Sequence, residues 1–134
     1  MVFLNADKLD ERHVRKVEKI MIRNEVSCAL SMWELDEKSM LEDMEHFILN
    51  SDGVIVFYGN VNALWVRKRL HYCRNLIFRR EEPLKALAVY EGPPRDKMDY
   101  NFTIPGLKTI NCRDCFDEEK LRPFLEAIGK GGWS

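Results

Sequence analysis

The sequence predicts an α/β domain in three layers, with a five-stranded, mainly parallel sheet and helices on both of its faces. Short apolar runs alternate along the chain with segments whose apolar residues recur at helical spacing. Residues 54–57 are apolar at every position, which is typical of a central strand that is buried on both sides. The 134 residues, of which 46% are hydrophobic, are enough for a single core and a single domain.

The first half of the chain predicts two strands and two helices. Residues 2–4 form the first apolar run, and a helical pattern begins at Asp10. A second short strand is expected at residues 26–30. Ser39 is followed three residues later by Glu42, which is the pattern of a capping box, so we expect the second helix to begin at Ser39.

The second half supplies the remaining elements, which are expected as follows: strands at 54–57, 84–90 and 107–112, an amphipathic helix from about residue 63, and a final helix capped by Asp117 that ends at Ile128. Because Pro123 lacks an amide donor, the regular part of that last helix should begin near Arg122. This order of elements favours a flavodoxin-like domain over residues 1–128, with residues 129–134 as a flexible tail or the start of a linker.

Composition argues against several functional classes. The net charge of −1 is not that of a globally basic nucleic-acid binder, and no apolar segment is long enough to cross a bilayer. The amino terminus lacks the pattern of a secretory signal, so we expect a cytoplasmic protein with no membrane partner. Cys112 and Cys115 form a lone pair that supplies only half of a structural zinc site, so no metal is expected, and a redox role for the pair stays open.

Three loops should meet where the strands end, at residues 5–8, 33–38 and 58–62, because ligands of such sheets bind outside the carboxyl ends of the strands. Gly59 either permits close approach of a ligand or simply forms a turn. The asparagines at 60 and 62 can cap the next helix, and Trp65 is expected to pack against the sheet. The candidate ligand-binding residues are Asn5, Asp7, Tyr58, Gly59, Asn60, Asn62 and Trp65.

The stretch Ser51–Leu70, with Trp65 just inside a helix, and the later Val89–Pro94 resemble Toll/interleukin-1 receptor (TIR) domains, in particular divergent bacterial TIR-like modules of defence and signalling proteins. The resemblance spans nearly the whole chain. It implies a TIR-like domain within a larger bacterial protein. It also implies that the loop at 33–38 takes the place of the loop through which these domains usually self-associate.

In TIR domains that cleave NAD, a glutamate lies four residues after the tryptophan, and the matching residue here is Arg69. An arginine cannot accept a proton or stabilise an oxocarbenium ion. The resemblance therefore implies a non-catalytic module without a cofactor, which acts through self-association or partner binding. The alternatives are a NAD-processing enzyme whose acid is Glu34, Glu37 or Glu42, and a sensor that binds NAD or a related nucleotide.

Charge is distributed unevenly between two segments. Residues 34–45 contain six acids and one lysine, whereas residues 61–80 contain six cations and no acid. Opposite patches favour head-to-tail assembly, although both segments also fit the solvated faces of ordinary amphipathic helices. The expected interaction surface, for protein partners rather than nucleic acid, consists of Trp33, Glu34, Asp36, Glu37, Arg67, Lys68, Arg69 and Arg74.

Overall fold

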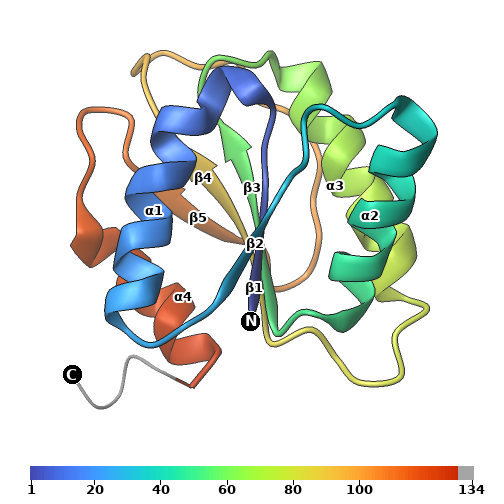
Figure 1. Ribbon diagram of the computed structural model, residues 1–134. Helices are drawn as coiled ribbons and strands as arrows, with labels where there is room; N and C mark the ends of the chain where they lie inside the picture. Colours follow the sequence, from blue (N-terminus) through green and yellow to red (C-terminus); the bar gives the residue numbers. More distant parts are fainter. Residues whose placement is uncertain (130–134) are drawn as a thin grey trace.

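The computed structural model describes residues 1–129 and confirms the α/β class (Figure 1). All five strands are parallel, and they are β1 (Val2–Asn5), β2 (Cys28–Leu30), β3 (Gly53–Tyr58), β4 (Ala86–Glu91) and β5 (Lys108–Asn111). The helices are α1 (Glu11–Arg23), α2 (Glu37–Asn50), α3 (Ala63–Ile77) and α4 (Arg122–Ala127), with short 3-10 helices η1 (Lys8–Asp10) and η2 (Glu118–Leu121). The strand order β2-β1-β3-β4-β5 is the flavodoxin-like order.

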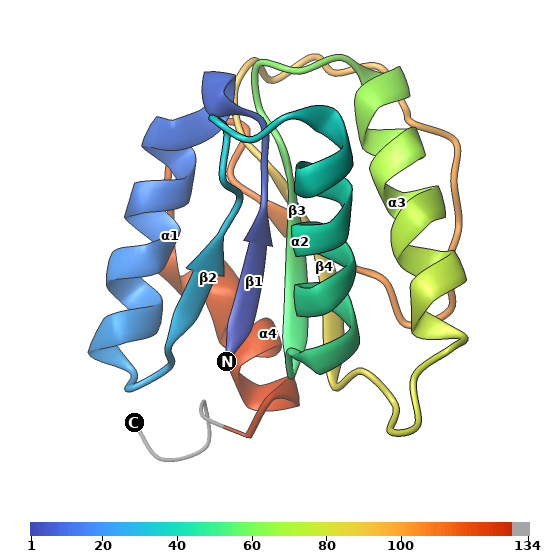
Figure 2. The ribbon, with the colours of Figure 1, turned by 45° about the vertical axis from the view of Figure 1, so that its right-hand side comes forward.

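Two apolar cores lie on opposite faces of the sheet. Helices α1 and α4 cover one face, and α2 and α3 cover the other (Figures 1 and 2). Alternate residues of a strand point to opposite faces, so Val2 and Leu4 join the first core and Phe3 joins the second. Every residue of β3 and β4 is buried, as expected for strands covered on both sides.

The connection between β4 and β5 contains no helix. Residues 92–107 run as an irregular segment, and its apolar side chains at positions 100, 102, 104 and 107 pack against the core beside α3. The segment therefore supplies part of the layer that a crossover helix usually forms. It also crosses the carboxyl edge of the sheet, where it contributes Lys97 and Met98 to the loops described below.

The predicted start of the second helix is wrong by two residues. Helix α2 begins at Glu37, and its cap is Asp36, whose Oδ1 accepts a hydrogen bond of 2.7 Å from the amide of Ser39. Ser39 thus stands in the first turn, because the aspartate three residues earlier already occupies the capping position. The second strand likewise begins at Cys28, because Glu25 has a positive φ of 60° and the Val26 amide donates back to Met21 at the end of α1.

The carboxyl-terminal helix follows the predicted pattern. Asp117 caps η2, and regular α-helix begins only at Arg122, with Pro123 in the first turn, where its missing amide donor costs nothing. The predicted tail beyond Gly129, including Trp133, lies outside the described residues.

Candidate functional site

The chain leaves two adjacent strands in opposite directions at the carboxyl edge of the sheet. From β1 it continues to α1 on one face, and from β3 it continues to α3 on the other (Figure 2). The loops at residues 6–10 and 59–62 therefore diverge at a topological switch point. Flavodoxin-like folds place their ligands at such points, so this is the first place to search for a site.

Asp10 fastens these two loops together. Its fully buried carboxylate accepts hydrogen bonds from the Gly59 amide (3.2 Å), the Asn60 amide (2.6 Å) and Asn60 Nδ2 (3.1 Å). Asn60 Nδ2 also donates to the Leu9 carbonyl at 3.1 Å. Asn60 therefore connects the two loops and does not cap the helix. The sequence did not identify Asp10 as its partner.

Gly59 is explained by packing against Asp10. A Cβ atom at this position would lie 2.5 Å from Asp10 Oδ1 and 2.8 Å from His13 Cδ2. The His13 ring also lies 5.8 Å from the Tyr90 ring, and burial lowers the pKa of His13 despite the opposing charge of Asp10. Of the two predicted roles for Gly59, the structure supports a tight turn, with protein atoms in the space beside it.

Tyr58 lies beneath the connection between β4 and β5. Its hydroxyl donates to the Met98 carbonyl at 2.8 Å, and Lys97 Nζ lies 4.5 Å from the centre of its ring. Lys97 Nζ also donates to the carbonyls of Gly59 (2.7 Å) and Pro93 (3.1 Å). Burial raises the pKa of Tyr58 and lowers that of Lys97. Tyr58 is thus covered by protein rather than exposed to a ligand.

A pocket of about 440 Å³ opens between η1 and the start of α3. It is lined by Asp7, Leu9, Asn60, Val61, Asn62, Leu64, Trp65 and Lys68. The structure therefore brings together four of the candidate ligand-binding residues, namely Asp7, Asn60, Asn62 and Trp65. Asn62 caps α3 as predicted, since its Oδ1 accepts from the Trp65 amide at 2.8 Å. We call this space the switch-point pocket.

Arg69 adjoins the switch-point pocket through Trp65. Its guanidinium carbon lies 4.7 Å from the centre of the indole, and Nη1 lies 3.0 Å from Met44 Sδ. Burial lowers the pKa of Arg69, and the charge of Asp7 partly opposes this effect. Trp65 is half-buried and packs against the core formed with α2 and α3, as expected.

Asn5 lies at the end of β1 and is fully buried. Its Nδ2 approaches Met44 Sδ at 3.5 Å, whereas its Oδ1 has no hydrogen-bond partner among residues 1–129. Asn5 is not among the residues that line the switch-point pocket. Trp33, from the next loop, donates its indole N–H to the Ala6 carbonyl at 2.9 Å and so holds that loop against β1.

The alternative acids lie apart from the switch-point pocket. Glu34 is exposed in the loop before α2, and Glu42 lines a groove of about 610 Å³ on α2, together with Asp36, Glu37, Lys38, Leu41, Glu45 and Tyr72. We call this the acidic groove. Among the residues that line the switch-point pocket, Asp7 is the acid, and sequence reasoning named it only as a ligand contact.

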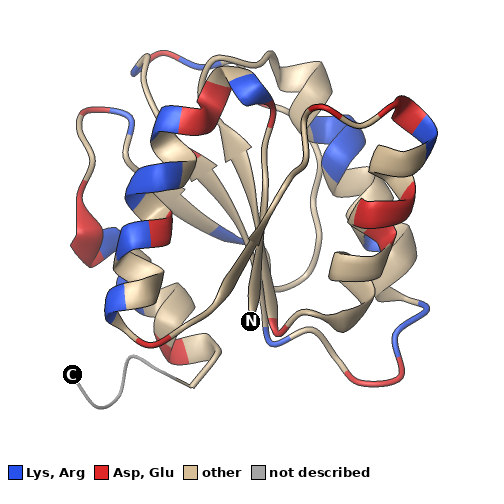
Figure 3. Cartoon of the chain, in the orientation of Figure 1, with Lys and Arg blue, Asp and Glu red and all other residues tan. Residues whose placement is uncertain are grey.

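The acidic and basic segments lie side by side on one face of the sheet (Figure 3). Arg79 on the chain after α3 pairs with Glu45 of α2 at 3.0 Å, and the Tyr72 hydroxyl donates to the Leu41 carbonyl at 3.1 Å. Of the cations expected on the interaction surface, Arg67 and Lys68 are exposed. Arg69 and Arg74 are half-buried, and Arg74 stacks on Phe102 at 5.2 Å.

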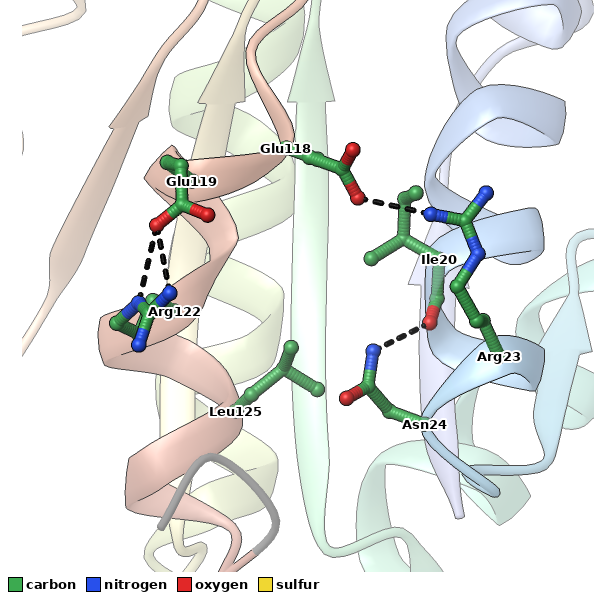
Figure 4. A pocket seen from close by; sticks show the side chains of 7 residues that line it. All are labelled: Ile20, Arg23, Asn24, Glu118, Glu119, Arg122 and Leu125. Carbon is green, nitrogen blue, oxygen red and sulfur yellow. Dashed lines mark hydrogen bonds and ion pairs between the residues drawn. The ribbon is translucent and has the colours of Figure 1, made fainter. Parts of the chain in front are cut away.

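A further pocket of about 200 Å³ lies between α1 and the last two helical segments (Figure 4). Its charged side chains pair with one another, Arg23 with Glu118 at 3.0 Å and Arg122 with Glu119 at 2.8 Å. Asn24 Nδ2 donates to the Ile20 carbonyl at 2.8 Å. This pocket is therefore explained as a set of surface ion pairs that join α1 to the carboxyl-terminal helices.

The cysteines are free thiols in different environments. Cys112 is buried, with Sγ 3.8 Å from the Asp117 carbonyl, and Cys115 is exposed in the following loop. Burial raises the pKa of Cys28 to about 11 and that of Cys73 to about 12. Both thiols therefore stay protonated near neutral pH and are poor nucleophiles.

The part of the chain that the structure describes carries neither a metal-binding cluster nor a membrane-spanning helix. Within residues 1–129, no three His, Cys, Asp or Glu side chains are grouped so that they can hold a metal ion. In the same range, no helix has the length and apolar composition needed to span a membrane. Comparisons with protein-family models, curated proteins and solved structures gave no significant match.

Proposed function

We propose that the protein is a non-catalytic, TIR-like interaction module of a larger bacterial signalling or defence protein, and that it pairs with a second copy through the outer surface of α2 and α3. The observation that carries this proposal is the presence of an acidic groove and an exposed basic patch next to each other on one face. Complementary charges of this kind steer and orient association.

The acidic groove presents unpaired charge around apolar surface. Glu37 and Glu42 are exposed and form no ion pair within residues 1–129, while Glu45 is already paired with Arg79. Leu41 is 37% exposed and lies in the same groove as the half-buried ring of Tyr72. The groove thus offers both carboxylates and contact area to a basic partner surface.

The basic patch lies at the start of α3. Arg67 and Lys68 are exposed, and Leu64 beside them is 56% exposed. In a parallel α/β fold each crossover helix begins at the carboxyl edge, so this patch and the first turn of α2 are at the same end of the same face. In a two-fold dimer, the acidic groove of each copy contacts the basic patch of the other, so all four surfaces are covered. The head-to-tail chain expected from the sequence would leave one such surface uncovered at each end.

Self-association is expected to depend on salt. By light scattering, the protein should be dimeric at about 10 mM salt and monomeric at about 1 M, where the screening length falls from about 30 Å to about 3 Å. Glu37→Lys with Glu42→Lys should be monomeric, and so should Arg67→Glu with Lys68→Glu. A mixture of these two variants should restore a dimer, because each contact again joins opposite charges.

The matched control reverses exposed charges on the other face, Lys19→Glu with Glu126→Lys, and should leave the dimer intact. A protein that is monomeric at every salt concentration, or a mixture of variants that fails to associate, would remove self-association from the proposal.

Turnover of NAD is not expected. At the position where the resemblance places a catalytic glutamate, Arg69 is stacked on Trp65, and a guanidinium can neither take up a proton nor stabilise a cationic transition state. Nicotinamide released from NAD by the concentrated protein, measured by chromatography, should match the buffer blank. Release that disappears in Glu34→Ala or Glu42→Ala would instead establish the enzymatic alternative.

A further inference from the structure

A row of cations runs along the outer side of η1 and α1, where Lys and Arg recur from turn to turn (Figure 3). Its members are exposed and follow one another at intervals of three or four residues, which places them on one helix face: Lys8, Arg12, Lys16 and Lys19. The opposite face of α1 is buried in the core. At a rise of about 1.5 Å per residue, the row is about 16 Å long. We call it the α1 row.

The acids near the α1 row are paired with other residues. Glu11 and Glu18 both pair with Arg15, at 3.4 and 3.1 Å, and Glu118 pairs with Arg23 at 3.0 Å. Within residues 1–129, none of the four cations of the row forms an ion pair. The row therefore presents positive charge that no neighbouring carboxylate compensates.

This arrangement is unfavourable for the helix itself. Lys16 lies four residues after Arg12, and Lys19 lies three residues after Lys16, and like charges at these spacings repel each other. An ordinary solvated helix face mixes charges of both signs, as Arg15 does with its two glutamates. Locally unfavourable patterns are expected at functional sites, and an anion bound along the row would remove the repulsion.

We propose that the α1 row binds the phosphate backbone of a double-stranded nucleic acid, without reading its sequence. A duplex carries about one charge per 1.7 Å of its axis, so a row of about 16 Å faces several phosphates. Within residues 8–19, Leu9 is the exposed apolar residue, and every other exposed side chain is charged. Protein interfaces and membrane insertion rely on apolar anchors, and single-strand platforms rely on aromatic rings, whereas phosphate contacts need only cations.

The net charge of −1 does not oppose this binding, because the charges are separated in space. Residues 34–45, with six acids and one lysine, belong to α2 and the loop before it, whereas the row lies on the α1 side of the sheet. The expectation against nucleic acid rested on the charge of the whole chain, which averages over the two sides. The proposed pairing uses the α2 and α3 side, so it leaves the row uncovered and the two proposals are independent.

The test is the fluorescence anisotropy of a labelled DNA duplex of about 20 base pairs and mixed sequence. At about 50 mM salt, we expect half-saturation below about 100 μM protein. Each neutralised phosphate contributes about 0.9 to the salt dependence, so the logarithm of the association constant should fall with the logarithm of salt concentration at a slope of about −3.6.

Lys19→Gln should weaken this binding severalfold at about 50 mM salt and change the slope to about −2.7. Its thermal midpoint without DNA should stay the same or rise, because the variant removes like charge next to Arg15 and Lys16. Since Lys19 lies on the face away from the proposed pairing, its dimer in light scattering should stay intact. Failure of the row and failure of the pairing are thus seen in separate measurements.

Lys38→Gln is the matched control, because Lys38 is also an exposed helical lysine without an ion pair within residues 1–129, but it lies on α2. This variant should leave the slope unchanged. The proposal is overturned if the duplex does not bind at about 100 μM protein, or if Lys19→Gln weakens binding no more than Lys38→Gln does. Tighter binding of phosphatidylserine vesicles or of poly-glutamate than of the duplex would also overturn it.

Discussion

Asp10→Ala is expected to lower the free energy of unfolding by about 3 kcal/mol, measured by urea denaturation. The buried carboxylate accepts three hydrogen bonds from Gly59 and Asn60, and two of the donors are backbone amides. Its removal leaves these donors without their acceptor and also opens a cavity at the switch point. Loss of hydrogen bonds to a charged group, with desolvation of the remaining partners, accounts for an effect of this size.

The matched control for this variant is Asp96→Ala. Asp96 is exposed in the connection between β4 and β5, so its replacement should change stability by less than about 0.5 kcal/mol. If Asp10→Ala cost no more than this control, the Gly59 and Asn60 amides would be satisfied without Asp10, and its anchoring role would be refuted.

Gly59→Ala should be nearly as damaging, by about 2 kcal/mol in the same measurement. The added methyl group would lie 2.5 Å from Asp10 Oδ1 and 2.8 Å from His13 Cδ2, and Asp10 can move away only by weakening its hydrogen bonds to the amides of Gly59 and Asn60. Gly92→Ala is the control with a milder clash, because a Cβ atom at Gly92 would lie 3.2 Å from the His13 ring. It should lower the free energy of unfolding by less than Gly59→Ala does.

The two substitutions should not be additive. In the double variant Asp10→Ala with Gly59→Ala, the closest clash is removed together with the anchor, so the combined loss should fall short of the sum by about 1 kcal/mol. A strictly additive pair would mean that the contact with His13, and not the space that Asp10 occupies, excludes a side chain at Gly59.

The sequence predicts the strands and helices well because their apolar patterns are local. The buried run at residues 54–57 and the Asn62 cap needed only neighbouring residues to be recognised. The start of α2 was missed because Asp36 and Ser39 are both good caps, and the choice between them depends on the backbone angles of the loop.

The contacts of the candidate site were less accessible from sequence because they join distant segments. Tyr58 and Gly59 were correctly expected at the carboxyl edge, but the hydrogen-bond partners of Gly59, which are Lys97 and Asp10, are 38 and 49 residues away from it in the sequence. The residues next to Tyr58 and Gly59 in the sequence do not indicate that protein atoms, and not a ligand, cover them. The contact between Arg69 and Trp65, by contrast, could be predicted, because side chains four residues apart on a helix lie next to each other.

The helix-free connection between β4 and β5 has a consequence for protein engineering. Near its end, Gly106 has a φ of +82°, is exposed, and has no atom within 4 Å of the position a Cβ would take. The registers of β4 and β5 are fixed by their own pairing, so added residues at this point would not shift either strand. Since each doubling of a flexible loop costs only about 0.6 kcal/mol, a short tag inserted at Gly106 is expected to leave the strand pairing intact, with a local cost where Ile104 and Leu107 pack against the core.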